Sequence, residues 1–591
     1  MKTKGCILLF VLCNTLILNA QNFNFQRAWA TYYGDESLTG GLNGLNIQNL
    51  KSKIDTNGNL YLVGTVYNNP NPHFLIATSN GYQTTFGGGE SDGFMVKYDP
   101  NGALLWSTYF GGEGNDSITG ISIDDQNNIF ISGSTTSTQN IASINTYQIS
   151  LSGTNDGFLA QFTADGNKVW TTYYGGNGYD DIGDVVLDSV GNLFVFSFTD
   201  SEAMATTGTF QPIRNNTNTL ISSFTKNGLR NWASYYGING SKITSIGANL
   251  SGLYVYGSTD DCSPYLPNSY FATTGCHQPN PGSCNDAFLS KFSNSGQRIW
   301  STYYGGYSLE YDTGDGVICN TNSIYITGYT YGNNNITTVG AFQEMFSPPF
   351  TSFLVKFNND GVREWGTFYG KTIVTSGSRP ASVNIDHQDN VYLSGYTGFS
   401  QNIATLGSYQ EVLSGGVDAF VVKFNPNGER LWGTFYGDLG SESCKTLFYN
   451  DSFYLVGVTT SIQNMTTAGA FQTNFINNAN PNITLPSNIF IAKFEPIPLT
   501  TNQFENNLIQ IYPNPNNGKF TLNGKSNSFS QKGTLSIYDA LGRKIKKFEL
   551  DANENYFNQE FDCSAILSLG VYTVKLEFDT TESKTFKMIV N

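Results

Sequence analysis

Acidic side chains in one set of connecting segments form the largest group of residues in this sequence that could bind a ligand. These segments are "GDES", "GEGNDS", "GNGYDD", "GYSLEYDTGD" and "GDLGSES". Carboxylates that converge could hold Ca²⁺ through hard oxygen ligands, or bind cationic or sugar groups. The candidate ligand-binding residues are therefore Asp116, Asp180, Asp181, Asp312, Asp315 and Glu442. Further acids of the same segments are Asp35, Glu113, Glu310 and Asp438.

Other interpretations of these acids stand beside ligand binding. On a chain with a formal net charge of −15 they can be solvated loop charge, and their spacing does not match the Ca²⁺ loop of EF-hands. Two carboxylates at a suitable separation can also catalyse glycoside hydrolysis. Catalysis has little further support, because His73, His277 and His387 are far apart in the sequence and no nucleophile elbow is expected. The Gly-rich "GGGESDG" (87–93) is followed by no helix and is interpreted as a turn. The sequence favours a protein without catalytic residues, with a polysaccharide hydrolase or lyase as the alternative.

A repeated unit must position these acids. After "KVWTTYYGG" come "DDIGDVVLD", the turn "SVGN", "LFVFSFT", a connection with "TGTFQ", "TLISSFT", the turn "KNG" and "LRNWASYYG". The four segments with period-two character predict one four-stranded antiparallel sheet. The last strand of each unit contains one of the seven Trp residues of the chain, which are Trp29, Trp106, Trp170, Trp232, Trp300, Trp365 and Trp432.

Two polar positions recur in every unit and are interpreted as structural. The first turn begins with Asp or Asn, whose side chain can bond its own backbone two residues on; these are Asp55, Asp124, Asp188, Asn249, Asn320, Asp386 and Asn450. A Gln in the long connection is expected to tie that loop to backbone groups; the seven are Gln83, Gln148, Gln211, Gln278, Gln343, Gln410 and Gln472.

The first Trp strand precedes its own sheet. Each later Trp follows a turn Gly by four positions, whereas "NFNFQRAW" has no such Gly. Residues 443–494, at the other end, supply three strands without a fourth. The chain therefore closes a ring by placing residues 27–33 beside the strand at about 488–494. We predict an all-β fold, a seven-bladed β-propeller of four-stranded blades followed by a small β-sandwich.

The repeat also resembles a known family. The pattern "WSTYYGG…D…GN.Y..G.T…Q…DAF..KF…G…W" is similar to the SBBP-type β-propeller repeat of bacterial secreted and surface proteins over residues 27–494. This resemblance implies a propeller fold but no single activity.

The C-terminal region has a different pattern. "YPNPNNGKFTL" (512–522), "LSIYDALGRKI" (535–545), "GVYTVKL" (570–576) and the final "KTFKMIVN" resemble the type A C-terminal sorting domain of the type IX secretion system. The resemblance implies a Bacteroidetes-type source and a secretion machinery as partner. The expected domains are a signal peptide at 1–20, the propeller at 21–494, a linker at 495–507 and a sorting β-sandwich at 508–591.

The N-terminal segment predicts export. Lys2 and Lys4 precede the apolar run "CILLFVLCNTLIL" and the small-residue site Asn19-Ala20. The run is too short to span a bilayer permanently, so we expect no transmembrane segment in the mature chain. We expect transfer to the periplasm and then release or display at the outer surface. An acidic protein repels phosphate backbones, so nucleic acid is disfavoured as a partner.

Cysteine and loop positions complete the predictions. Cys262, Cys276 and Cys284 share one irregular stretch, where export permits a disulfide whose pairing the sequence does not choose. Cys319 and Cys444 lie in predicted strands and are interpreted as buried. The long connections between second and third strands, together with those that follow the Trp strands, share one face, which is the expected binding face for an extracellular glycan or protein.

Overall fold

The computed structural model describes most of the chain of 591 residues. The described residues are 23–34, 50–68, 76–238, 240–259, 270–282, 285–306, 310–311, 316–332, 335–348, 350–370, 379–476, 487–497, 510–514, 516–525, 532–540, 542–551, 556–578 and 583–590. All regular elements among them are β-strands. The chain divides into two compact units, residues 1–496 and 497–591, and each is described by itself.

The larger unit contains seven antiparallel sheets. We name the strands of each sheet A to D from the centre to the rim and number the sheets as blades 1 to 7. Blade 1 is β2 (Lys51–Ile54), β3 (Leu60–Tyr67), β4 (Ser91–Tyr98) and β5 (Leu104–Phe110). Blade 2 is β6 (Asp116–Ile123), β7 (Ile129–Thr135), β8 (Asp156–Phe162) and β9 (Lys168–Tyr174). Blade 3 is β10 (Asp180–Leu187), β11 (Leu193–Thr199), β12 (Thr219–Phe224) and β13 (Arg230–Tyr235).

The remaining blades follow the same order. Blade 4 is β14 (Lys242–Asn249), β15 (Gly252–Ser258), β16 (Ala287–Phe292) and β17 (Arg298–Tyr304). In blade 5 the A strand is split, giving β18 (Glu310–Tyr311), β19 (Val317–Cys319), β20 (Ser323–Thr330), β21 (Thr351–Asn358) and β22 (Arg363–Tyr369). Blade 6 is β23 (Arg379–Ile385), β24 (Val391–Thr397), β25 (Asp418–Phe424) and β26 (Arg430–Tyr436). Blade 7 takes β27 (Glu442–Tyr449), β28 (Ser452–Thr459), β29 (Asn488–Pro496) and β1 (Phe25–Tyr33).

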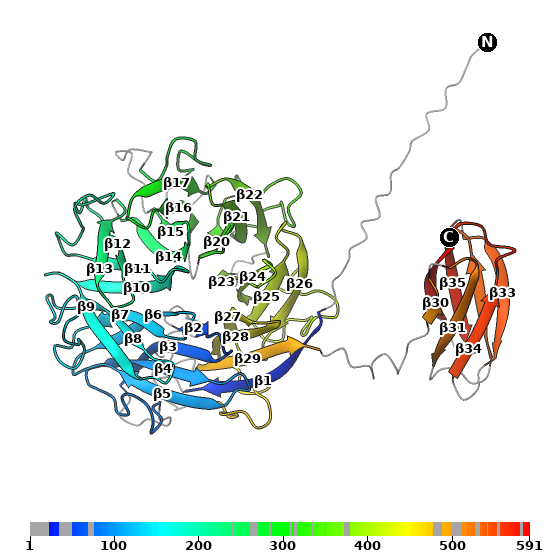
Figure 1. Cartoon of the computed structure of the whole chain (residues 1–591), viewed down its shortest axis with the longest axis horizontal. Coiled ribbons are helices and arrows are strands. Elements are labelled where there is room, and N and C mark those ends of the chain that lie inside the picture. The colour runs from blue at the N-terminus through cyan, green and yellow to red at the C-terminus, as the bar shows by residue number, and fades with distance from the viewer. Residues whose placement is uncertain are drawn as a thin grey trace, which may run out of the picture. The chain divides into compact units, whose positions relative to one another are not determined.

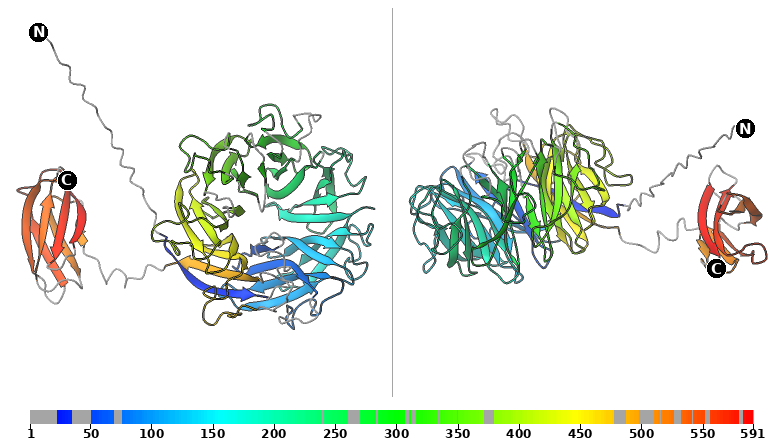
Figure 2. Two further views of the ribbon diagram at one scale, coloured as in Figure 1. Left: turned by 180° about the vertical axis from the view of Figure 1, so that it is seen from behind. Right: turned by 90° about the horizontal axis from the view of Figure 1, so that it is seen from above.

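The seven sheets form a ring with the A strands toward its centre (Figure 1). Seen along an edge, the ring is a disc of radiating sheets (Figure 2). Buried apolar side chains lie between neighbouring blades; one cluster joins Tyr392 and Trp432 of blade 6 to Phe453 and Phe490 of blade 7. The predicted seven-bladed propeller is confirmed.

The N-terminal strand completes the last blade, as predicted. β1 pairs antiparallel with β29, from Phe25 opposite Pro496 to Tyr33 opposite Ile489. The D strand of blade 7 therefore comes from the start of the chain, and it pairs the edge of β29 that would otherwise be free.

The Trp residues join each blade to the next. The Trp29 indole N–H donates to the carbonyl of Pro100, in the C–D turn of blade 1, at 3.0 Å. Gly102 of that turn has φ +86°, and a Cβ at this position would lie 2.7 Å from the indole ring. The five later Trp–turn contacts of this kind are Trp106–Ala164, Trp170–Lys226, Trp232–Asn294, Trp300–Asn359 and Trp365–Pro426. Each turn therefore requires Gly for its backbone and for the ring stacked on it.

Blade 7 has no C–D turn, because its two outer strands come from opposite ends of the chain. At the junction of blades 6 and 7 the Trp432 ring meets Phe23 edge-on, with centroids 4.9 Å apart. Phe25 also packs on Trp432, at 5.9 Å. Two N-terminal aromatic side chains thus occupy the place that a C–D turn takes in the other junctions.

The A–B turns use the predicted side-chain bonds in six blades. Asp55 Oδ1 accepts from the N–H groups of Asn57 and Asn59, both at 2.9 Å. The corresponding acceptors are Asp124, Asp188, Asn249, Asn320 and Asp386. Blade 7 differs, because Tyr449 pairs with Ser452 in a two-residue hairpin and Asn450 takes a left-handed φ of 52° there.

The smaller unit is a sandwich of two sheets. The first sheet is β30 (Gln510–Tyr512), β31 (Lys519–Lys525) and β34 (Tyr556–Asp562). The second is β33 (Lys544–Asp551), β32 (Lys532–Tyr538), β35 (Gly570–Phe578) and β36 (Ser583–Val590). Phe520 and Phe561 of one sheet share a buried cluster with Leu535 and Val574 of the other, so this unit has a core of its own.

Candidate functional site

One face of the propeller disc carries the long connections. Because the strands of each blade are antiparallel, the B–C connections and the D–A connections between blades lie on the same face. We call this face the loop face. Large aliphatic side chains that are 66% to 99% exposed occur in its connections, distributed over blades 2, 3, 5, 6 and 7: Ile144, Ile149, Ile213, Val339, Met345, Leu406, Val412, Leu439 and Ile462.

A pocket of about 310 Å³ opens on the loop face between blades 6 and 7. The B–C connection of blade 6 contributes Tyr409, Gln410 and Ser414 to it. The D–A connection contributes Asp438, and the B–C connection of blade 7 contributes Asn464. Three separate connections and the N-terminal strand, which supplies Arg27, therefore meet at this pocket.

The polar groups of the pocket hold one another in place. The Arg27 guanidinium lies 5.8 Å from the centre of the Tyr409 ring, and its Nη1 donates to the Asn464 carbonyl at 2.8 Å. Asn464 Nδ2 donates to Asp438 Oδ2 at 3.2 Å. Tyr409 is 38% exposed, so its ring keeps surface for a ligand. The pocket thus combines an aromatic surface with a cation, an anion and an amide.

The contact between Arg27 and Tyr409 belongs to a repeated set. An aromatic residue immediately before the recurring Gln receives a cationic side chain from the D strand of the next blade. The others of this set are Lys168 over Tyr82, Arg230 over Tyr147, Arg298 over Phe210 and Arg430 over Phe342. Sequence reasoning missed Arg27, Tyr409 and Asn464. The signal for Tyr409 was present, since every recurring Gln follows Tyr, Phe or His.

His277 occupies this aromatic position in blade 4. Its ring lies 5.9 Å from that of Tyr304 and 5.8 Å from that of Phe357. Burial and the nearby Arg363 lower the His277 pKa to about 4. His277 is therefore a neutral packing residue at the usual pH of a cell surface.

The cavity in the central channel has a smaller volume than the pocket on the loop face. A cavity of about 180 Å³ is lined by A strands from all seven blades. Lys51 Nζ and Asp184 Oδ2 form an ion pair across it at 2.9 Å, and Lys445 is 6% exposed nearby. Sites for small organic ligands measure ~300–1,000 Å³, so this cavity, as the described residues line it, is below that range.

Three of the predicted ligand-binding acids are buried between blades. Asp116, Asp180 and Glu442 begin the A strands of blades 2, 3 and 7 and are at most 1% exposed. Asp116 Oδ2 accepts from the Gly112 N–H and Ser137 Oγ, both at 2.8 Å. Glu442 Oε1 accepts from Thr459 Oγ1 and Ser461 Oγ. These carboxylates hold the D–A connections against the following strand and do not face a ligand in the channel.

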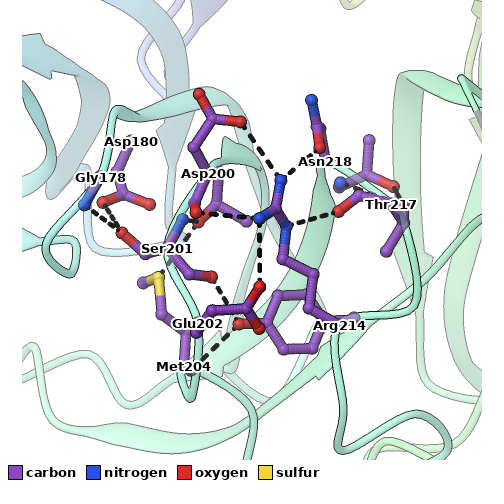
Figure 3. A network of polar contacts seen from close by, with 12 residues as sticks. Gly178, Asp180, Asp200, Ser201, Glu202, Met204, Arg214, Thr217 and Asn218 are labelled. Atoms are coloured by element: carbon purple, nitrogen blue, oxygen red, sulfur yellow. Dashed lines mark hydrogen bonds and ion pairs between the residues drawn. The ribbon is translucent and has the colours of Figure 1, made fainter.

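Asp180 belongs to a larger network on the loop face (Figure 3). Ser201 Oγ donates to Asp180 Oδ2 at 2.7 Å and accepts from the Gly178 N–H at 2.8 Å. Beside it, Arg214 donates to the Asp200 carbonyl and to Thr217, and pairs with Glu202 at 3.2 Å. This network joins both ends of the B–C connection of blade 3, so its charges are used within the fold.

The other predicted acids are distributed differently. Asp181 is partly buried in β10, and burial raises its pKa to about 6. Glu113 is exposed and accepts from the Thr138 N–H and hydroxyl. Asp312, Asp315 and Asp35 lie outside the described residues, as does the side chain of Glu310.

Metal and thiol candidates give no catalytic centre in the described part of the chain. No group of three His, Cys, Asp or Glu side chains placed for a metal occurs there. His387 lies 3.4 Å from Asp451, and His73 is outside the described residues. Cys444 is fully buried, and the partly buried Cys319 lines the channel. Cys262 and Cys284 also lie outside the described residues, whereas Cys276 is described and is partly buried.

Comparison with known families agrees with the geometry. Residues 510–591 match the secretion system C-terminal sorting domain, and residues 105–140 match the SBBP beta-propeller repeat. The predicted resemblance is confirmed: the chain carries an SBBP-type propeller repeat and a type IX sorting domain. The sorting domain indicates export to the cell surface or the medium.

Individual relatives are distant. The chain is 21% identical over 503 residues to the uncharacterized WD repeat-containing protein L264 of Acanthamoeba polyphaga mimivirus, which covers 69% of this chain and 35% of that protein. The chain thus spans about a third of the length of this curated relative. Pyrococcus horikoshii acylaminoacyl peptidase is similar at 10% identity and a TM-score of 0.35, covering 84% of this chain and 61% of that one. PorZ, a surface component of the type IX secretion system of Porphyromonas gingivalis, is similar at 11% identity and a TM-score of 0.23, covering 93% and 75%. Both scores are low, so the fold assignment rests on the strand pairing.

Within the described residues, no helix has the length and apolar character needed to cross a membrane.

Proposed function

We propose that the propeller is a non-catalytic binding module that recognises an extracellular glycan through the pocket between blades 6 and 7. The observation that carries this proposal is the exposed Tyr409 ring beside Arg27, Asp438 and Asn464 in a pocket of about 310 Å³. A sugar presents an apolar face that can pack on an aromatic ring, and hydroxyls that bond to such charged and amide groups. The module reaches its ligand after transfer to the periplasm through a signal peptide and export by the type IX machinery.

A paired substitution tests this proposal. The purified full chain is screened against polysaccharides, with both retention and released oligosaccharide measured. Tyr409→Ala removes the pocket ring and should weaken binding at least tenfold. Tyr147→Ala is the matched control, because Tyr147 has the same place in blade 2 and is 39% exposed against 38% for Tyr409. Equal loss in both variants, or none in Tyr409→Ala, would reject the pocket as the glycan site.

A protein ligand is the second candidate. The exposed aliphatic side chains of the loop face favour it, because burial of such groups drives protein association. A triple substitution of Ile144, Leu406 and Val412 to Ser should then abolish partner capture while leaving glycan retention unchanged. The hydrolase or lyase alternative is less favoured, because Asp116, Asp180 and Glu442 are buried. Oligosaccharide release that Asp180→Asn or Asp181→Asn abolishes would support that alternative instead.

A further inference from the structure

A pair of carboxylates is buried at the junction of blades 1 and 2. Asp92, the second residue of β4, is 0% exposed, and Asp116, at the start of β6, is 1% exposed. Gly111 lies between them, such that a Cβ on Gly111 would touch Asp92 Oδ1 and come within 2.8 Å of Asp116 Oδ2. Asp92 Oδ1 and the Asp116 carboxylate therefore lie on either side of Gly111, with Asp116 Oδ2 as the nearer oxygen.

Each of these carboxylates has one oxygen without a hydrogen-bond partner in the described structure. Asp92 Oδ2 accepts from the Gly87 N–H at 2.5 Å, and Asp116 Oδ2 accepts from Gly112 and Ser137. Both Oδ1 atoms are buried and accept no bond. Among the described residues neither acid forms an ion pair with Lys or Arg. Two buried anionic oxygens thus lack the compensation that such groups normally have.

The corresponding acids between blades 6 and 7 are fully compensated. Asp418 Oδ2 accepts from Gln410 Nε2 at 2.7 Å and from the Ser414 N–H, and its Oδ1 accepts from Gly415. Glu442 Oε1 accepts from two hydroxyls, and its Oε2 accepts from the Asp438 N–H. At the junction of blades 2 and 3, Asp156 also receives the Gln bond, while Asp180 Oδ1 accepts none, like Asp116 Oδ1. The feature particular to blades 1 and 2 is therefore the open Oδ1 of Asp92.

A one-residue insertion accounts for the open oxygen of Asp92. Asp418 follows Gln410 by eight positions, as Asp156 follows Gln148, and in both cases the Gln Nε2 donates to the acid at 2.7 Å and also to the carbonyl two residues after the Gln. Asp92 follows Gln83 by nine positions, and Gln83 Nε2 keeps only the second of these bonds, to the Thr85 carbonyl. The longer loop is the "GGG" of residues 87–89, which lies directly against the carbonyls of residues 112–114. With this extra residue in the loop, Asp92 Oδ1 receives no hydrogen bond from it.

The charge balance points the same way. Burial, together with the nearby Asp116, raises the Asp92 pKa to about 7. Burial also raises the Asp116 pKa. Two carboxylates held this close cannot both ionise cheaply unless a cation or a proton lies between them.

We propose that Asp92 and Asp116 bind a divalent cation, Ca²⁺, at the junction of blades 1 and 2, through the open Asp92 Oδ1 and the neighbouring Asp116 carboxylate. The pair supplies two negative charges, and neutral oxygens of water, backbone carbonyls or Ser137 complete the shell that Ca²⁺ accepts. Extracellular Ca²⁺ modules bind with dissociation constants of ~10⁻⁴–10⁻³ M, which suits a two-carboxylate site on an exported protein. The bound ion would tie the glycine loop to the next blade.

The test measures Ca²⁺ binding to the full chain. After EDTA treatment and desalting, the protein is dialysed against CaCl₂ labelled with ⁴⁵Ca. The Ca²⁺ concentration is about 10⁻³ M, the weaker end of the range of dissociation constants given above. Wild type should bind one ion more per chain than Asp92→Asn, and Asp116→Asn should show the same loss. Asp418→Asn is the matched control and should bind as wild type does. Ca²⁺ should also raise the Tm of wild type and of Asp418→Asn, but not that of Asp92→Asn.

Equal Ca²⁺ binding by wild type and by both junction variants overturns the proposal. Loss of the same ion in Asp418→Asn overturns it as well, because that pair has no open oxygen. Circular dichroism of each variant establishes that it is folded. Asp116→Asn decides the outcome if Asp92→Asn does not fold. A wild type without Ca²⁺ binding, combined with a higher Tm of Asp92→Asn in EDTA, would instead assign a shared proton to the pair.

Discussion

Gln472 and Thr31 are hydrogen-bonded although 441 positions of the chain separate them. The Gln472 N–H donates to Thr31 Oγ1 at 2.9 Å, and the Gln472 carbonyl accepts from the N–H of Tyr32 at 3.0 Å. In blade 2 the same two bonds join Gln148 to Thr172 and Tyr173, only 24 and 25 positions further along the chain. The seam of the ring therefore uses the contacts that hold an ordinary blade together.

Thr31→Val tests this seam. It leaves the buried Gln472 N–H without its acceptor, which should cost about 1–3 kcal/mol of the free energy of unfolding. Thr172→Val makes the same change inside blade 2 and should cost a similar amount. Urea unfolding of both variants provides the measurement. If Thr172→Val destabilises while Thr31→Val does not, the N-terminal strand is not part of the cooperative fold.

Gly102→Ala should destabilise more than Gly208→Ala. Both glycines have φ +86°, so each Ala pays a similar backbone strain of ~1–2 kcal/mol. Only the Cβ at Gly102 would meet the Trp29 indole, at 2.7 Å, whereas nothing lies within 4 Å of the Cβ at Gly208. The difference between the two unfolding free energies isolates the contact between blades 7 and 1. Equal losses would mean that the Trp29 ring moves away from the new methyl group without lowering the free energy of unfolding.

The sequence was sufficient to predict the number of blades but not the burial of the acids. Trp29 without a preceding turn Gly, and six later Trp with one, determine the ring closure by counting. Asp116 and Asp180 looked like loop charge because they follow Gly-rich segments. Their burial depends on Ser137 and Ser201, which follow the next strand of the same blade by two positions. The signal was a recurring Thr-x-Ser at 135–137, 199–201 and 459–461, but its partner acid lies about 20 positions earlier.

The pocket on the loop face was beyond sequence reasoning for a similar reason. Arg27 reaches Tyr409 across 382 positions only once the ring is closed. The aromatic residue before each recurring Gln was visible, but its cationic partner sits in the following blade. Asn450 shows the opposite case: the turn residue was noticed, yet the tight hairpin places it one position out of register.

His277→Phe should remove part of the acid sensitivity of the propeller. Burial and Arg363 hold the folded-state pKa at about 4, below the ordinary value of 6.5. Between these two values the unfolded chain binds a proton that the folded protein does not, so stability falls as pH decreases from 6.5 to 4. Over this pH range the free energy of unfolding of wild type should fall by about 1–2 kcal/mol through His277. The full pKa shift would give more, but the ring is only partly buried and solvent screens its charge.

The groups that face His277 are Arg363 and the rings of Tyr304 and Phe357. Phe is the natural replacement, because the other six blades have Tyr or Phe at this position. Tm measured from pH 7 to pH 4 should therefore decline less steeply for His277→Phe than for wild type. Parallel curves for the two proteins would show that His277 titrates normally in the fold.

Removal of residues 508–591 should block export without unfolding the propeller. The sorting domain matches residues 510–591 and has its own buried core, including Phe520, Leu535 and Val574. The propeller is the other compact unit and closes its ring without any strand from the sandwich. In a bacterium with a type IX system, the truncated chain should accumulate in the periplasm, detected by immunoblotting of cell fractions. Its thermal unfolding should match that of the propeller in the full chain.

Deletion of residues 21–34 is the contrasting control, because it removes β1 and should lower Tm. Truncated protein in the medium at the wild-type level would mean that the sandwich is not the export signal.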